Sequence, residues 1–196
     1  QIKAACGSGS MWRKSSSLGT VKGARPFMTD PSIYLDTNIF SAFWYEGHDI
    51  ASIVRRMHTR EWWEFERKHF RIWVSVTTVR ELEAGQFARQ ADCVKMARRI
   101  PRLAVSKATY AVSRRLLETG ILPASKPGDA MQMAIASAHE VDYLLTWNYS
   151  HLCNPLAQGR LEEVCGNLGL RAPLIVSPES IPQQRWGQTI RRPDGS

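Results

Sequence analysis

The sequence predicts an α/β protein, a three-layer α/β/α sandwich with a central parallel sheet. Short apolar runs of three to five residues recur along the chain, and each is bounded by polar or breaker residues. Segments with the apolar period of an amphipathic helix separate these runs. Strands that alternate with helices in this way form parallel sheets covered on both faces. With 196 residues, of which 43% are hydrophobic, the chain suits one such domain.

The first two elements lie near the start of this domain. Residues 32–36 read Ser-Ile-Tyr-Leu-Asp, an apolar run that closes on an acid, which is typical of a buried strand with a polar carboxyl end. Over residues 49–70 apolar side chains return every three to four positions among Arg, Lys and Glu. This period predicts an amphipathic helix.

The second apolar run, residues 72–75, predicts another strand. Thr77 or Thr78 can cap a following helix over 79–84, because a hydroxyl at that position accepts a hydrogen bond from a free helical N–H. This helix carries Glu81 in its first turns. The predicted strand therefore leads directly into a helix with an acidic side chain.

The same alternation continues to the end of the domain. A run of Pro, Ser and Gly ends just before Asp129, so we expect Asp129 in the first turn of a strong helix, where the helix dipole favours an acid. The remaining predicted elements are, in chain order, helices over 87–99, 107–119 and 129–140, a strand over 142–146, a helix over 156–168 and a strand over 174–176.

Two terminal segments differ in composition from the domain that we expect over residues 28–182. Residues 1–27 are rich in Gly, Ser, Lys and Arg and resemble a flexible leader or an expression remnant. Residues 183–196 predict a loose basic tail. Because residues 1–27 hold five basic and no acidic side chains, the formal charge of +8 falls to +3 for the rest. A moderately basic body suits a polyanionic partner.

The cysteines and the hydropathy indicate a compartment. Four cysteines lie far apart, with no C-x-x-C pair, which argues against a disulfide framework or structural zinc and favours a reducing environment. No apolar run approaches the roughly 20 residues that span a bilayer, and the N-terminus lacks the apolar core of a secretory signal. We therefore expect a cytoplasmic protein.

Polar residues gather where the predicted strands end. Asp36 ends the first strand, Glu81 follows the second, Asp129 opens the helix before the third, and Thr146 and Asn148 follow the third. Ligands of parallel α/β sheets bind outside the carboxyl ends of the strands. Converging carboxylates repel one another unless a cation neutralises them, and hard oxygen ligands favour Mg²⁺ or Mn²⁺. Such an ion can activate water for phosphodiester hydrolysis.

Four blocks of the sequence together resemble the signature blocks of PIN domains, and they are most similar to the VapC-like toxin branch. The blocks are residues 35–38 (Leu-Asp-Thr-Asn), 79–85, 126–134 and 142–148, and the resemblance spans about residues 31–178. It implies an endoribonuclease dependent on Mg²⁺ (or Mn²⁺), commonly the toxin of a type II toxin–antitoxin pair. It also implies a homodimer that a small antitoxin protein holds inactive.

The resemblance assigns roles to individual residues. Catalytic positions are Asp36, Glu81, Asp129 and Asn148, of which the three acids hold the metal, and supporting positions are Thr37, Asn38 and Thr146. Asn148 departs from the pattern, because many PIN domains have a fourth Asp there. Asp142 cannot replace it, since six extended residues span roughly 20 Å. The site therefore has one formal charge fewer, and we expect weaker metal binding.

Other functions remain open at the level of sequence. A nuclease of the same fold could process RNA without an antitoxin, and a PIN-derived module could bind RNA or a protein without cleaving it. Three acids around a metal could also serve a phosphoesterase that acts on DNA or small phosphates. Tryptophans could stack on bases, but their helical or strand spacing favours packing in the core or at a subunit interface. They are Trp62, Trp63, Trp73 and Trp147.

Overall fold

The computed structural model describes residues 30–120, 122 and 125–181, and its centre is one five-stranded parallel sheet. The strand order is β3-β2-β1-β4-β5, and every pair of neighbours runs parallel. The strands are β1 (Ser32–Leu35), β2 (Arg71–Ser75), β3 (Arg102–Leu103), β4 (Tyr143–Leu145) and β5 (Leu174–Val176). The predicted parallel sheet is confirmed.

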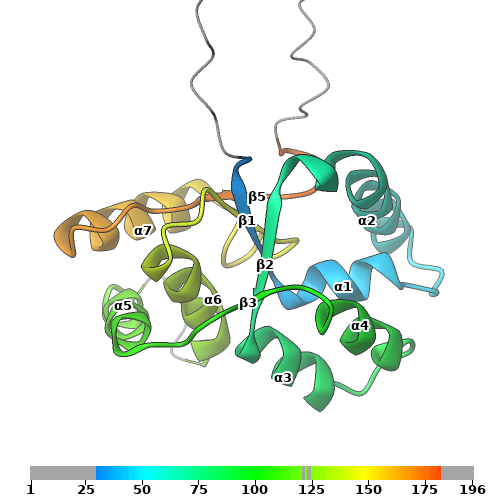
Figure 1. Ribbon diagram of the computed structural model, residues 1–196, viewed down its shortest axis with the longest axis horizontal. Coiled ribbons are helices and arrows are strands. Elements are labelled where there is room, and N and C mark those ends of the chain that lie inside the picture. Colours follow the sequence, from blue (N-terminus) through cyan, green and yellow to red (C-terminus); the bar gives the residue numbers. More distant parts are fainter. Residues whose placement is uncertain (1–29, 121, 123–124, 182–196) are drawn as a thin grey trace, which may run out of the picture.

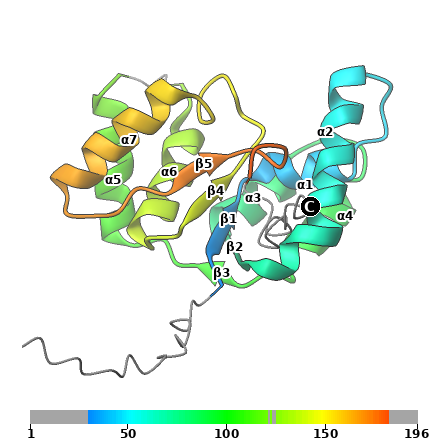
Figure 2. The same ribbon diagram turned by 90° about the horizontal axis from the view of Figure 1, so that it is seen from above.

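Helices cover both faces of this sheet, as Figures 1 and 2 show. One layer contains α1 (Thr37–Phe43), α2 (Ile50–Glu61), α3 (Val76–Ala84) and α4 (Gln90–Ala97). The other layer contains α5 (Lys107–Glu118), α6 (Pro127–Ala138) and α7 (Pro155–Asn167). The predicted α/β/α sandwich is therefore confirmed.

Alternating strand residues divide the core into two clusters. On β1, Ile33 and Leu35 pack into the cluster under α1–α4, whereas Tyr34 between them packs into the cluster under α5–α7. On β4, Leu144 and Leu145 divide in the same way. This follows from the two-residue period of a strand, which points successive side chains to opposite faces. All five side chains are fully buried.

The start of α3 differs from the prediction that Thr77 or Thr78 caps a helix over 79–84. The helix begins three residues earlier, at Val76, because the Ser75 hydroxyl caps it by accepting a hydrogen bond from the Thr78 N–H. Thr78 is instead buried inside the first turn. The cap is therefore the last residue of β2, and strand and helix follow without a loop.

The predicted helices over 49–70 and 87–99 were too long. The first is α2, which ends at Glu61, and the chain continues as a π-helical turn, η1 (Trp62–Glu66), and a 3-10 turn, η2 (Arg67–His69). The second, α4, begins only at Gln90 because Arg89 adopts a left-handed conformation with φ of 64°. The short elements α1 and β3 are additional to the predicted ones.

Four further expectations concern the terminal segments, the hydropathy, the cysteines and the tryptophans. The segments 1–27 and 183–196 lie outside the described residues. Within the described ranges, no helix combines the length and hydropathy needed to cross a bilayer. The described cysteines are all free: Cys93, Cys153 and Cys165. Trp62 and Trp147 are buried, with 1% and 5% exposure, as their spacing predicted.

Candidate active site

The candidate site lies where the direction of chain winding changes. The connections from β1 to β2 and from β2 to β3 contain α1–α4 and lie on one side of the sheet (Figure 1). Those from β3 to β4 and from β4 to β5 contain α5–α7 and lie on the other side. The carboxyl ends of β1 and β4, side by side in the sheet, mark this switch point, which is where such folds bind ligands. Asp36 follows β1 there, and its N–H donates to the Leu145 carbonyl at 3.0 Å.

Asp36 is buried and held by three donors. Its Oδ1 accepts a hydrogen bond from the Thr37 N–H at 2.6 Å, so Asp36 also caps α1. Its Oδ2 accepts from the Thr146 hydroxyl at 2.6 Å and from the Asn38 amide at 2.7 Å. The side chain is only 6% exposed. The carboxylate that ends β1 is therefore oriented by the start of α1 and by the end of β4.

Burial raises the pKa of Asp36 from 3.8 to about 6. The hydrogen bond from Thr146 opposes this rise, whereas the negative charges of Glu81 and Asp129 add to it. Glu81 and Asp129 thus both lie near enough to repel the charge of Asp36. A cation at this position would remove that repulsion.

Glu81 projects from α3 toward the same edge. Its Oε2 accepts hydrogen bonds from the Thr37 hydroxyl at 2.5 Å and from the Gln132 amide at 3.0 Å. Its Oε1 accepts none from a described residue. A Cβ on Gly128 would lie 3.1 Å from this Oε1, a distance that crowds the oxygen. Glycine at this position therefore leaves Oε1 uncovered.

Asp129 occupies the first turn of α6, as predicted. Its Oδ2 is buried and has no hydrogen-bond partner among the described residues. A buried, unpartnered carboxylate oxygen costs free energy that a hydrogen bond or a cation would offset. The dipole at the start of α6 offsets part of this cost. Asp129 Oδ2 is thus a buried acceptor without a donor in the described part of the chain.

The three acids suit a hard cation in their chemistry, although they are not a finished coordination sphere. In the described arrangement, no group of three His, Cys, Asp or Glu side chains could hold a metal ion. Each acid nevertheless retains acceptor capacity: Asp36 Oδ1 accepts one hydrogen bond, and Glu81 Oε1 and Asp129 Oδ2 accept none from described residues. All are oxygens, which Mg²⁺ and Mn²⁺ prefer. Binding such an ion requires the side chains to move closer together.

The predicted supporting residues form one network, but Asn148 takes a separate position. The Asn38 amide donates to Thr146 Oγ1 at 3.0 Å, and its Oδ1 accepts from the Trp147 N–H at 2.9 Å. The Asn148 N–H also donates to Thr146 Oγ1. The Asn148 side chain, however, is engaged in the next turn, where Oδ1 accepts from Ser150 and His151. It shapes the loop after β4 in this arrangement.

The sequence analysis missed a buried polar chain behind Glu81. The Tyr34 hydroxyl donates to Gln132 Oε1 at 2.5 Å and lies 2.8 Å from the Ser75 hydroxyl and 3.0 Å from that of Thr78. Burial raises the pKa of Tyr34 above its ordinary value. Two signals could have revealed this chain: a tyrosine inside an apolar strand, and a glutamine one turn after Asp129 in an otherwise apolar helix.

Asp142 lies at the other end of β4, as its sequence position implied. Its Oδ2 accepts hydrogen bonds from the N–H and the hydroxyl of Ser32, both at 2.7 Å, and its Oδ1 accepts from Arg171 at 2.9 Å. Ser32 begins β1, whereas the acids gather where β1 ends. Asp142 therefore joins strand starts and takes no part in the candidate site.

Two hollows border the acids. One of about 140 Å³ lies beside α1 and α2 and is lined by Asn38, Ser41, Ala42, Tyr45, Ser52, Arg55 and Trp147. The other, of about 570 Å³, lies on the side of α3 and α6. The smaller hollow contains Arg55 and shares Asn38 with the hydrogen bonds of Asp36. The larger one contains Arg80 and Gly128, the residues directly before Glu81 and Asp129.

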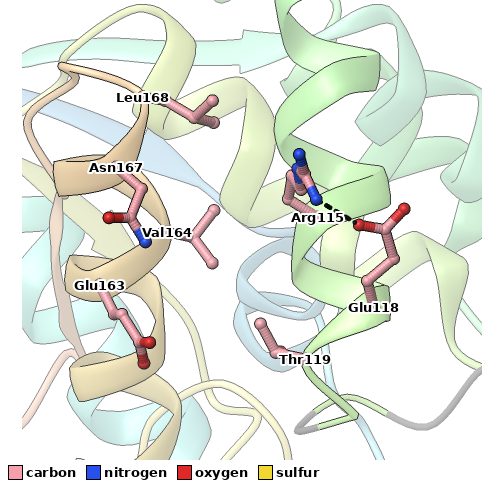
Figure 3. A pocket seen from close by; sticks show the side chains of 7 residues that line it. All are labelled: Arg115, Glu118, Thr119, Glu163, Val164, Asn167 and Leu168. Atoms are coloured by element: carbon pink, nitrogen blue, oxygen red, sulfur yellow. Dashed lines mark hydrogen bonds and ion pairs between the residues drawn. The ribbon is translucent and has the colours of Figure 1, made fainter.

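A further pocket of about 450 Å³ lies between α5 and α7 (Figure 3). It contains two carboxylates, but each has a partner: Glu118 pairs with Arg115, and Glu163 pairs with Arg160. These are exposed ion pairs, and their charges are already balanced. This pocket therefore lacks the unbalanced acids that mark the site at the sheet edge.

Comparisons with known proteins assign no family. No protein-family model matches the chain, and no curated protein matches it significantly.

Proposed function

We propose that this protein is a divalent-metal-dependent endoribonuclease of the PIN type, most similar to VapC-like toxins. The observation that carries the proposal is Asp129, whose buried Oδ2 has no donor among the described residues and whose charge acts on Asp36. Asp36 and Glu81 share Thr37 as a hydrogen-bond donor, so all three acids belong to one cluster. A cluster at the switch point of a parallel sheet is placed for ligand binding.

In this proposal Asp36, Glu81 and Asp129 hold Mg²⁺ or Mn²⁺. When bound, the ion supplies an acidified water as nucleophile and charge stabilisation at the phosphoryl oxygens. The chain itself orients the carboxylates, because Thr146 and Asn38 fix Asp36 while Thr37 and Gln132 fix Glu81. These hydrogen bonds hold the two carboxylates in fixed orientations, which reduces the reorganisation needed when the ion binds.

The choice of RNA as substrate, and the toxin role with its homodimer, small antitoxin and cytoplasmic location, rests on the four sequence blocks. The structure adds the parallel α/β fold on which those blocks would function. Basic side chains beside the acids, Arg55 and Arg80, suit a phosphate backbone. Both lines of support agree on a polyanionic substrate.

A second candidate function is a PIN-derived module that binds RNA or a protein without cleaving it. Two observations favour it: the described arrangement has no group of three side chains that could hold a metal, and the Asn148 side chain is committed to the turn after β4. An antitoxin-independent RNA-processing nuclease would share the same acids and differ in its genetic context.

Incubating the purified protein with total cellular RNA in EDTA, Mg²⁺ or Mn²⁺ tests these alternatives. Asp36→Asn and Asp129→Asn are the test variants, and Asp142→Asn is the control because Asp142 lies at the opposite end of β4. Metal-dependent cutting by the wild type and Asp142→Asn, lost in both test variants, supports the nuclease. RNA binding without cutting under any metal, by folded protein, supports the binding module instead.

A further inference from the structure

The larger hollow beside the acids has a mainly apolar lining with one aromatic and one basic side chain. It has a volume of about 570 Å³, and its walls come from α3, the segment after β3, α5 and the start of α6. The lining includes Arg80 on α3, Tyr110 on α5 and Gly128 at the start of α6. None of the lining residues is acidic. The lining therefore suits an anionic ligand with an apolar surface.

Gly128 connects this hollow to the candidate site. It belongs to the wall, and a Cβ there would lie 3.1 Å from Glu81 Oε1. Arg80, in the part of the wall that α3 forms, is the residue directly before Glu81. A ligand in the hollow would therefore lie close to the Glu81 carboxylate.

Two side chains of the lining are unengaged. Tyr110 on α5 is 61% exposed, and its hydroxyl has no hydrogen-bond partner among the described residues. Arg80 is exposed and, within the described part of the chain, makes no ion pair, unlike Arg98, Arg115 and Arg160. An exposed ring and a free guanidinium are the two groups that bind single-stranded nucleic acid, by stacking on a base and by contacting phosphate.

We infer that this hollow binds one unpaired nucleotide of the RNA, next to the phosphate that is cut, with Tyr110 stacked on the base and Arg80 on the backbone. This inference rests on the proposed function and specifies its substrate as single-stranded at that position, because a base inside a duplex is already stacked on both faces. The volume lies in the range of pockets that hold small organic ligands.

The test measures binding separately from cleavage. Each variant is made in the Asp129→Asn background, and the dissociation constant for a fluorescein-labelled single-stranded oligoribonucleotide is measured by anisotropy in EDTA. Tyr110→Ala is expected to weaken binding about tenfold, whereas Tyr110→Phe, which keeps the ring, stays within about twofold. Arg80→Ala is expected to weaken binding. It should also reduce the steepness with which log affinity falls against log salt concentration by about 0.7. Arg160→Ala, on α7 and away from the hollow, removes the same charge and is the control.

An oligoribonucleotide with one abasic position supplies a second measurement. If Tyr110 stacks on that base, the losses from the abasic site and from Tyr110→Ala are not additive. Equal affinities for Tyr110→Ala and its parent, or no measurable binding by the parent, overturn the inference. A wild type that cuts RNA while Tyr110→Ala binds normally leaves the nuclease proposal standing without this site. Weakened binding by Tyr110→Ala with no cutting by the wild type supports the site and contradicts the nuclease.

Discussion

The Thr37 hydroxyl donates a 2.5 Å hydrogen bond to Glu81 Oε2 across 44 positions of sequence. The N–H of the same residue donates to Asp36 Oδ1 at 2.6 Å. One threonine at the first position of α1 therefore joins the acid that ends β1 to the acid of α3. Its two donors set how these carboxylates face each other.

Replacing Thr37 with valine should reduce RNA cleavage more than it reduces stability. Valine keeps the shape but removes the donor to Glu81, which then keeps only Gln132, while the backbone bond to Asp36 remains. We expect kcat to fall at least tenfold and the free energy of unfolding to fall by about 1 kcal/mol. Steady-state kinetics and thermal melts measure the two effects. Thr37→Ser should restore most of the activity, and unchanged kcat in Thr37→Val would contradict this role.

Replacing Gln132 with methionine should destabilise the protein. Gln132 is 2% exposed and links the Tyr34 hydroxyl to Glu81 Oε2. Methionine fills a similar volume but leaves Glu81 short of one donor, which costs about 1–3 kcal/mol. Chemical denaturation measures this loss. Gln158→Met, on α7 and partly exposed, is the comparison, and an equal or larger loss there would argue against a special role for Gln132.

Asp129→Asn should abolish stabilisation by metal without harming the metal-free fold. No described residue donates to Asp129 Oδ2, so the substitution removes no hydrogen bond, and it relieves repulsion on Asp36. For the wild type, Mn²⁺ at about a hundred times its Kd should add about 2.7 kcal/mol. Differential scanning fluorimetry in EDTA and in Mn²⁺ compares the two. The same shift with metal in both proteins would exclude Asp129 as a ligand.

Without metal, the protein should become more stable as pH falls from 7 to 4. The folded-state pKa of Asp36, about 6, lies above the ordinary 3.8, so the folded chain binds a proton that the unfolded chain does not bind in this window. Keeping this carboxylate charged above pH 6 costs on the order of 3 kcal/mol. Unfolding in EDTA across this range should show the trend for the wild type and a flatter profile for Asp36→Asn. Parallel stability profiles of the wild type and Asp36→Asn would contradict this role of Asp36.

The contribution of Asp142 to stability should change with pH in the direction opposite to that of Asp36, and Asp142→Asn should remove it. Although desolvation by burial raises its pKa, the hydrogen bonds from Ser32 and Arg171 outweigh this and hold the pKa of Asp142 below its usual 3.8. The charged form therefore stabilises the fold above pH 3.8, and the contribution is lost as pH falls through the lowered pKa. The melting temperatures of wild type and variant should differ at pH 7 and converge as the pH falls through this lowered pKa. RNA cleavage by the variant at 25 °C should be unchanged.

Local patterns in the sequence determined the layers and the positions of the acids. The run at residues 32–36 predicts a strand closing on Asp36, and the breakers before Asp129 predict its place in the first turn of α6. Both predictions succeed because strand period and helix starts depend on neighbouring residues. The cap of α3 was misassigned because Ser75, Thr77 and Thr78 are all good caps, and the end of β2 decides among them.

Tertiary structure alone decided the strand order, the donors of each carboxylate and the direction of Asn148. Thr146 reaches Asp36 across 110 positions, and Gln132 reaches Tyr34 across 98. Such partners are set by which strands lie side by side and which helix faces pack together, so no local pattern specifies them. The sequence therefore determined that one acid follows β1 and another begins α6. Packing determined that Asp36 is buried and that Asp129 Oδ2 has no donor among the described residues.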